Sequence, residues 1–248
     1  KRIFMFITII MNIAIPSFNR HLTLGKNTLT FLNSMNGFEL EDITIFVANQ
    51  QQFDLYHSEF PDYNIVIGEK GIVNIRNFIN QYYDLDQYIV CLDDDIERLN
   101  EENPNLFIEG ENELNRTGFS LWGVNCISNK FFIDKQAKIT NTLKFCIGGM
   151  FGIKNKKIIL DHECSTKEDY QNTILHYFHS KGIVRFNHVS FKSKMFADGG
   201  IGNQIDRLNQ NEIAVNYLLE IYPTLTSLFL RKNGWKEIRL RHTHRFEL

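Results

Sequence analysis

Several features that mark other kinds of protein are scarce or missing in this chain. Its four cysteines are widely spaced and form no Cys-x-x-Cys pair, which argues against a zinc-binding or redox dithiol motif of that kind. The formal charge is only −2, from 27 Lys and Arg against 29 Asp and Glu, so an overall positive field is not expected to hold nucleic acid. There is no low-complexity tract and no repeat. We expect free thiols in a reducing compartment.

Long apolar runs are also missing, apart from one at the N-terminus. Ile3–Met11 follows two basic residues, as the start of a signal peptide would. It is shorter than the roughly 20 residues that a membrane span needs, and no small-residue cleavage site precedes Pro16. We therefore expect a soluble protein without a membrane span. Met11 is one candidate for the natural start, and the sequence leaves open whether residues 1–10 belong to the domain.

What the chain does have is ample material for a core. Of its 248 residues, 43% are hydrophobic and 23% are charged, which suits one α/β domain of ordinary size. Basic residues gather near the C-terminus although the chain as a whole is almost neutral: Arg231, Lys232, Lys236, Arg239, Arg241 and Arg245.

The first half alternates apolar runs with amphipathic segments. Continuous apolar runs are typical of parallel strands that are covered on both faces, and strand–helix alternation predicts crossover helices. We therefore predict a mostly parallel, Rossmann-like sheet from strands at 13–15, 43–48, 64–67 and 88–92, with helices at 26–35 and 72–82 and a polar helical stretch after the second strand.

The second half has an α+β texture. No linker separates it from the first, so we predict one domain, with a nucleotide-binding half at about 11–100 and an acceptor-side half at about 101–248. Residues 101–117 are polar and are expected to form a surface loop. The remaining predicted elements are strands at 119–126, 144–153 and 183–191 and helices at 169–180 and 212–221.

Three consecutive carboxylates, Asp93, Asp94 and Asp95, follow the fourth predicted strand directly. At the carboxyl end of a parallel strand they would project into the crevice where open α/β sheets bind ligands. Adjacent carboxylates repel one another, and Mg²⁺ or Mn²⁺ relieves that repulsion while keeping positions for water and phosphate oxygens. The alternative is a solvated acidic turn that caps a helix beginning at Ile96.

Two further turns carry polar groups suited to a nucleotide. After the first strand, Pro16, Ser17, Asn19 and Arg20 offer a hydroxyl, an amide and a cation, although such a turn is also a common cap. After the third strand a glycine turn opens a helix, which suits phosphate or nucleobase edges but lacks the Walker and three-glycine patterns. The candidate residues of this second turn are Gly71, Arg76 and Asn77.

Taken in order, these motifs resemble the nucleotide-sugar-binding half of GT-A glycosyltransferases. There a Pro-Ser/Thr-Tyr/Phe-Asn turn ends the first strand, a glycine loop leads to an Arg-Asn helix, and an Asp-x-Asp motif follows the fourth strand. The resemblance implies that Asp93 meets the ribose, that Asp95 binds the metal bridging the diphosphate, and that Asn49 lies near the nucleobase. It also implies that Gly148 and Gly149 line the donor sugar and the acceptor.

The resemblance further implies a catalytic pair, in which Asp169 is the base of an inverting transfer and Glu168 holds an acceptor hydroxyl. Both could instead be first-turn residues that stabilise a helix dipole. A histidine often completes the metal site in such enzymes; we favour His188, with His242 and His244 as rivals. Residues 197–202 read as a loop that closes over the donor.

Over about residues 12–241 the chain most resembles the small glycosyltransferases associated with TET/JBP-type DNA base oxidases and related viral or phage enzymes. This resemblance implies that the acceptor is a hydroxymethylated base in DNA, while a glycan or a protein acceptor stays an equal alternative. We also expect a UDP-sugar donor and a cytoplasmic location, which is the host cytoplasm for a viral protein. The basic C-terminal cluster would then suit phosphate contacts. Two other readings stay open: a nucleotidyltransferase acting on a sugar phosphate, and a non-catalytic nucleotide-sugar-binding module. The oligomeric state is not predicted.

Overall fold

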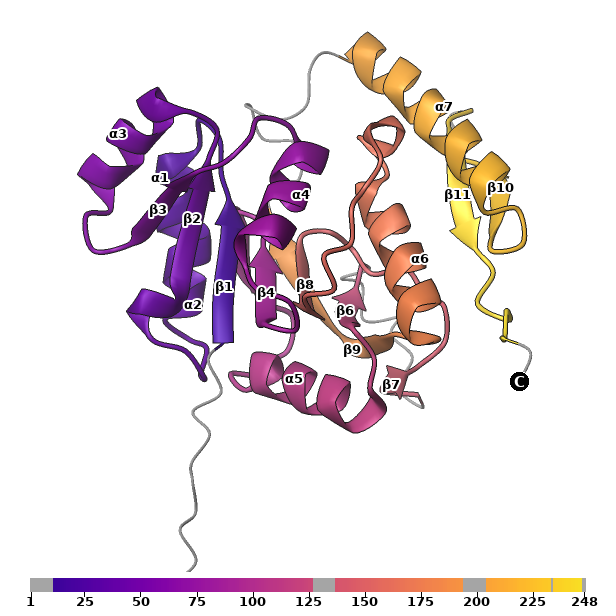
Figure 1. The fold of residues 1–248 in the computed structure, drawn as a ribbon, viewed down its shortest axis with the longest axis horizontal. Coiled ribbons are helices and arrows are strands. Elements are labelled where there is room, and N and C mark those ends of the chain that lie inside the picture. Colours follow the sequence, from indigo (N-terminus) through magenta and orange to yellow (C-terminus); the bar gives the residue numbers. More distant parts are fainter. Residues whose placement is uncertain (1–10, 127–136, 194–203, 233, 247–248) are drawn as a thin grey trace, which may run out of the picture.

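The computed structural model describes residues 11–126, 137–193, 204–232 and 234–246, and only the backbone of 204–207. In the first half, strands alternate with helical segments as the hydrophobic pattern predicts (Figure 1). The elements in chain order are β1 (Met11–Pro16), α1 (His21–Leu24), the π-helical turn η1 (Gly25–Leu29), α2 (Thr30–Leu32), the 3₁₀ turn η2 (Leu40–Asp42), β2 (Ile43–Val47), α3 (Gln50–Glu59), β3 (Asn64–Ile67), α4 (Ile72–Tyr82) and β4 (Tyr88–Leu92).

The second half adds strands of both directions. Its elements are β5 (Ile96–Leu99), α5 (Leu106–Thr117), β6 (Leu121–Asn125), β7 (Ile139–Thr140), β8 (Met150–Lys154), the 3₁₀ turn η4 (His162–Cys164), α6 (Glu168–Ser180), β9 (Val184–Ser193), α7 (Gln204–Ile221), β10 (Thr226–Leu230) and β11 (Lys236–Leu240).

One large sheet runs through the described part of the molecule in the order β3-β2-β1-β4-β8-β6-β9-β5, with β7 beside β9. The strands β1 to β4 are parallel, whereas β8 is antiparallel to both β4 and β6. Because β1 lies between β2 and β4, the segments that follow these strands emerge along one edge of the sheet. The predicted fold class, a parallel first half joined to a mixed second half, is confirmed.

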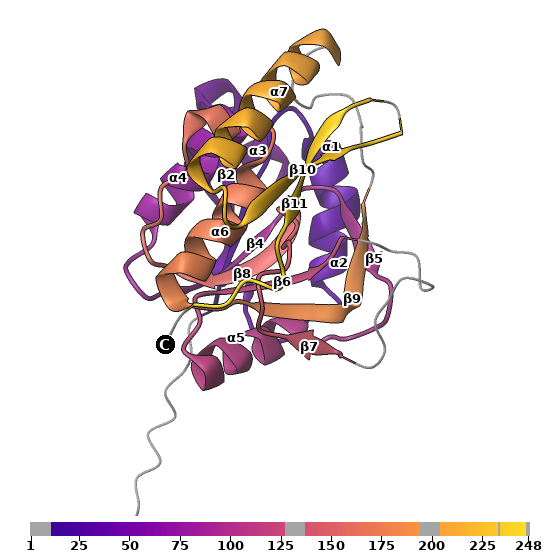
Figure 2. The same ribbon diagram turned by 90° about the vertical axis from the view of Figure 1, so that its right-hand side faces the viewer.

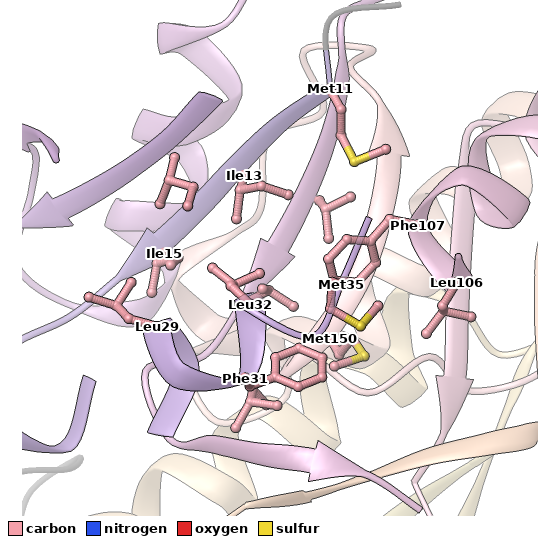
Figure 3. Close-up of a cluster of buried hydrophobic side chains, with 14 of the residues drawn as sticks. Met11, Ile13, Ile15, Leu29, Phe31, Leu32, Met35, Leu106, Phe107 and Met150 are labelled. Atoms are coloured by element: carbon pink, nitrogen blue, oxygen red, sulfur yellow. The ribbon is translucent and has the colours of Figure 1, made fainter. Parts of the chain in front are cut away.

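Alternating side chains of the parallel strands enter two separate cores. Ile13 and Ile15 of β1 and Val90 of β4 belong to one core, while Ala14 and Cys91 belong to the other. This follows from the two-residue period of a strand. Helices α1, α2 and α5 cover the first face, shown in Figure 3, and α4 and α6 cover the second, as Figure 2 shows.

Residues 101–117 are not a surface loop, so that prediction is wrong. Helix α5 begins at Leu106, and Leu106, Phe107 and Leu114 are fully buried against the sheet. The face of α5 that packs against the sheet has few apolar side chains, because one of its positions is Gly110. There the indole of Trp122 packs directly against the helix backbone. The helix ends at Gly118, whose φ of +75° gives the left-handed conformation that glycine adopts easily.

One predicted strand is shorter than expected, and a C-terminal hairpin was not predicted. The strand predicted at 144–153 is limited to β8, and the residues before it form turns that carry Gly148 and Gly149. The C-terminal basic segment forms the antiparallel hairpin β10–β11, which packs against α7 to the right of α6 in Figure 1. No helix in the described ranges is both long and apolar enough to span a bilayer.

Candidate active site

The acidic triplet lies directly beyond β4 and is fixed through its backbone. The amide of Asp93 donates to the carbonyl of Gly149 at 3.0 Å. The hydroxyl of Thr28 donates to the carbonyl of Asp93 at 2.7 Å and accepts from the amide of Ile96 at 2.9 Å. The triplet is therefore a constrained turn between β4 and β5 and not the cap of a helix. Thr28 comes from η1, and no local sequence pattern pointed to it.

Arg20 joins the first turn to the second and third aspartates. Its guanidinium lies 2.8 Å from Asp94 Oδ1 and 3.1 Å from Asp95 Oδ2. Ser17 Oγ donates to the other oxygen of Asp94 at 2.6 Å. Asp94 has only 5% of its side chain exposed, and burial raises its pKa to about 7 despite the hydrogen bond from Ser17 and the charge of Arg20. The predicted candidates Ser17, Arg20, Asp94 and Asp95 thus form one cluster.

The polar residues after β1 and β2 support one another as a framework. Pro16 is the last residue of β1 and pairs with Phe46. Asn19 has a φ of +56° and exchanges two hydrogen bonds with the side-chain amide of Gln52, at 2.8 and 2.7 Å. Asn49 caps α3 by accepting from the amide of Gln52 at 3.0 Å. In this structure Asn49 therefore acts as a helix cap, and its expected place beside a nucleobase stays a prediction.

Arg76 connects α4 to the triplet. Its Nη2 lies 3.1 Å from Asp93 Oδ1 and 2.7 Å from the carbonyl of Gly148, and its guanidinium packs 5.1 Å from the ring centroid of Phe151. Only 6% of the side chain is exposed, and Nη1 has no hydrogen-bond partner within the described residues. Arg76 is thus a buried cation with unused donor capacity.

The two other candidates on this turn have structural contacts. Asn77 donates to the carbonyl of Leu160 at 2.9 Å and accepts from the amide of Leu160 at 2.8 Å. Gly71 is the N-cap of α4 with a φ of +101°, a conformation that favours glycine. Asn77 therefore holds the segment before η4 in place, while Gly71 permits the turn into α4.

The glycine pair before β8 lies between the two groups of acids. A Cβ atom on Gly148 would stand 3.2 Å from Glu168 Oε1 and 3.3 Å from Asp169 Cβ. A Cβ atom on Gly149 would stand 3.1 Å from Asp93 Oδ2. These glycines therefore bring the acids of α6 and the acids after β4 to one place. A pocket here is lined by residues that include Arg76, Gly148, Glu168 and Asp169.

Glu168 and Asp169 occupy the first turn of α6, as predicted. Burial raises the pKa of Glu168 to about 8, and the neighbouring charge of Asp169 adds to the shift. Burial also raises the pKa of Asp169 to about 6, while Lys167 and backbone hydrogen bonds oppose the increase. Burial therefore raises the pKa of both carboxyl groups toward the physiological range, which suits general acid–base chemistry.

The hairpin reaches this helix start through a buried ion pair that the sequence did not reveal. Lys167 Nζ lies 2.6 Å from Glu237 Oε1, with 10% and 9% of the two side chains exposed. Arg231 contacts the second oxygen of Glu237 at 2.5 Å but is 58% exposed. Lys167 also lies 5.6 Å above the ring of Tyr170. The C-terminal hairpin is thus attached beside Glu168 and Asp169.

The contacts of His188 and His244 within the described residues are with residues other than the acidic triplet, Glu168 and Asp169. His188 is on β9, where Nδ1 lies 3.0 Å from the carbonyl of Lys138 and the ring packs near Phe186. His244 lies 3.0 Å from the hydroxyl of Tyr177, eight residues and about 12 Å along α6 from Asp169. His242 is exposed after β11. The expected loop at 197–202 lies outside the described residues.

The donor set near Asp93 and Asp95 suits a hard divalent cation in part. Asp93 Oδ2 and Asp95 Oδ1 accept no hydrogen bond from the described residues, and Mg²⁺ or Mn²⁺ usually takes one or two carboxylates together with phosphate and water oxygens. Within the described ranges, no three His, Cys, Asp or Glu side chains form a metal site on their own. The residues therefore fit a cation that is shared with a diphosphate.

Comparison with known proteins gives structural matches only. No known protein family and no curated protein matches this chain. Among solved structures, Staphylococcus aureus TarS 1–349 superposes with a TM-score of 0.55 at 12% identity, covering 86% of this chain and 73% of that one. The chain spans 44% of the longer TarS structure.

Two other matches have similar scores. Mannosyltransferase PcManGT from Pyrobaculum calidifontis, in complex with GDP-Man and Mn²⁺, gives 0.57 at 9% identity, over 86% of this chain and 64% of that one. Glucosyl-3-phosphoglycerate synthase from Mycobacterium tuberculosis, with Mn²⁺ and UDP, gives 0.50 at 9%, over 94% and 87%. These likenesses confirm the GT-A fold. The particular resemblance to TET/JBP-associated or viral enzymes stays a prediction.

Proposed function

We propose that this chain is a metal-dependent glycosyltransferase that moves a sugar from a nucleotide-sugar to an acceptor hydroxyl. The observation that supports it best is the meeting of two acidic groups at Gly148 and Gly149, one after β4 and one at the start of α6. A binding module needs no second acidic pair at that place. The structural neighbours bind sugar nucleotides: one TarS structure contains UDP-GlcNAc, and PcManGT contains GDP-Man with Mn²⁺.

In the proposed reaction Asp169 takes the proton from the acceptor hydroxyl. The hydroxyl oxygen forms a bond to the anomeric carbon as the bond from that carbon to the diphosphate breaks, and the electron pair leaves with the diphosphate. Burial raises the pKa of Asp169 above the ordinary carboxyl range, which makes its carboxylate a stronger base for receiving the proton. Because this is a single displacement, the product has inverted anomeric configuration.

Burial and the neighbouring charge of Asp169 raise the pKa of Glu168, which favours its protonated form, and in that form it is able to donate a hydrogen bond to an acceptor oxygen. Asp93 and Asp95 would hold Mn²⁺ or Mg²⁺, which would neutralise the charge of the leaving diphosphate; His188 does not join these two carboxylates in a three-residue metal site among the described residues. Arg76 and Arg20 supply fixed positive charge beside them. We favour a UDP-sugar donor, an acceptor that is a glycan, a protein or a hydroxymethylated DNA base, and a reducing cytoplasm, since the four cysteines are unpaired.

Thermal-shift measurements with UDP, UDP-GlcNAc and GDP-Man, each with Mn²⁺ or with a chelator, test the donor site. We expect at least one UDP compound to raise Tm with Mn²⁺ and to lose its effect with the chelator, because ligand binding stabilises the folded state. Asp169→Asn should keep this shift and lose sugar transfer. Glu212→Gln is the matched control, since it removes a carboxylate that pairs with Lys236 at the surface.

No shift with any sugar nucleotide would contradict the proposal. A shift only with nucleoside triphosphates, accompanied by pyrophosphate release, would instead support a nucleotidyltransferase.

A further inference from the structure

Arg20 and Arg76 are both placed against the acidic triplet, but they are held in different ways. Arg76 contacts one carboxylate and is also fixed by the carbonyl of Gly148 and the ring of Phe151. The guanidinium of Arg20 has hydrogen bonds only to Asp94 and Asp95, and its buried Nε has no partner within the described residues. Arg20 is therefore free to exchange its partners when another cation or anion arrives, whereas Arg76 is not.

The charges around the triplet are close to balanced. When all three aspartates are ionised they contribute −3 and the two arginines contribute +2, so the cluster then carries a net charge of −1. A free divalent cation would make this cluster positive, and it would compete with Arg20 for Asp95. A cation that arrives with a diphosphate brings its own negative charge. Arg20 Nη2, displaced from Asp95, would then have a phosphate oxygen to bind in its place.

We propose that Arg20 is a built-in competitor for the metal site, which weakens binding of the free cation and makes the metal and the nucleotide diphosphate bind together. In this proposal Arg20 exchanges Asp95 for a phosphate oxygen when both ligands are present. The inference rests on the proposed function for its nucleotide part. Its metal part depends only on the contacts of Arg20 with Asp94 and Asp95.

Three variants separate charge from geometry. Arg20→Gln removes the competing cation, Arg20→Lys keeps it, and Arg98→Gln removes a charge from an exposed position on β5, only three residues beyond Asp95. Binding of Mn²⁺ is followed by electron paramagnetic resonance of the free ion, with and without saturating UDP. Binding of UDP is followed by calorimetry in saturating Mn²⁺. Neither measurement depends on catalysis.

We expect Arg20→Gln to bind free Mn²⁺ at least about 10-fold more tightly than the wild type, because a unit positive charge next to the site is removed. The same variant should bind UDP at least about 10-fold more weakly, since a charge-assisted hydrogen bond to phosphate is lost. The factor by which UDP improves Mn²⁺ affinity should fall accordingly, because coupling between two ligands is reciprocal. Arg20→Lys should lie near the wild type in free Mn²⁺ binding, and Arg98→Gln should match it throughout.

The proposal predicts tighter binding of Mn²⁺ and weaker binding of UDP in the same variant. A folding defect would weaken the binding of both ligands, so it cannot produce this result. Unchanged or weaker binding of free Mn²⁺ in Arg20→Gln overturns the proposal, as does an equal effect in Arg98→Gln. If the wild type binds Mn²⁺ but no nucleotide, the proposed function fails, while the Mn²⁺ comparison still tests the competition by Arg20.

Discussion

Breaking the buried pair between Lys167 and Glu237 should destabilise the protein and detach the C-terminal hairpin. Glu237→Ala removes the carboxylate and leaves the Lys167 ammonium, with 10% of its side chain exposed, without its ion-pair partner. Removing one partner of a buried ion pair typically costs about 3–5 kcal/mol. The share of Arg231 is small, because a pair whose arginine is 58% exposed contributes at most about 1 kcal/mol.

We therefore expect a loss of about 3 kcal/mol, which for a chain of this length lowers Tm by roughly 6–12 °C. The loss should depend on pH. Burial alone would raise the pKa of Glu237, but the hydrogen bond and charge of Lys167 lower it below the ordinary value. The stabilisation is therefore present above the ordinary carboxyl pKa of about 4.3, and it disappears as the pH falls through the lowered value.

Urea and thermal denaturation of wild type, Glu237→Ala, Lys167→Met and the double variant Lys167→Met/Glu237→Leu measure these effects. Each single variant should be destabilised, whereas the double variant should recover to within about 1–2 kcal/mol of the wild type, because it leaves no uncompensated charge buried. A Glu237→Ala protein as stable as the wild type at pH 7 would refute the reasoning. So would a double variant that loses the sum of the two single losses.

Three further outcomes follow from the described contacts. Glu168→Gln should gain stability relative to the wild type as pH rises above about 5, because burial raises the pKa of Glu168 in the folded state, so that the unfolded state ionises this carboxyl at lower pH and is favoured by doing so; Tm against pH measures this. Gly110→Ala should lower the free energy of unfolding by about 1–3 kcal/mol although alanine is the better helix former, because its Cβ would lie 2.4 Å from Nε1 of the buried Trp122 indole. Urea denaturation measures this change, and a more stable variant would contradict the prediction. Asn49→Ala should cost about 1 kcal/mol, because the amide of Gln52 loses its cap; a gain in stability would contradict it.

The parallel strands and the acids that follow them were predictable because local sequence determines both. Ile43–Val47 and Tyr88–Leu92 are continuous apolar runs, and a strand buried on both faces requires such a run. Asp93 directly follows the last residue of β4, so it lies at the edge of the sheet where the parallel strands have their carboxyl ends. Glu168 similarly marks a helix start in the sequence and in the structure.

Other parts of the site could not be predicted, because they depend on pairs of residues far apart in the chain. Lys167 and Glu237 are 70 positions apart, and neither lies in a distinctive pattern. Helix α5 was missed for a different reason: its inward face includes Gly110, whose missing side chain makes room for Trp122 and breaks the apolar periodicity.

The π-helical turn Gly25–Leu29 has a consequence for the length of its helix. It contains one more residue than an α-helical turn would need, and this places the Thr28 hydroxyl between the carbonyl of Asp93 and the amide of Ile96. Deleting a single residue there would give a regular α-helical turn, and the flanking side chains would keep their faces because a π turn accommodates one extra residue. The outer face of the helix would tolerate that change, but the turn that carries the acidic triplet would lose its two hydrogen bonds with the Thr28 hydroxyl. The spacing of this segment, and not only its composition, thus contributes to the position of the acidic triplet.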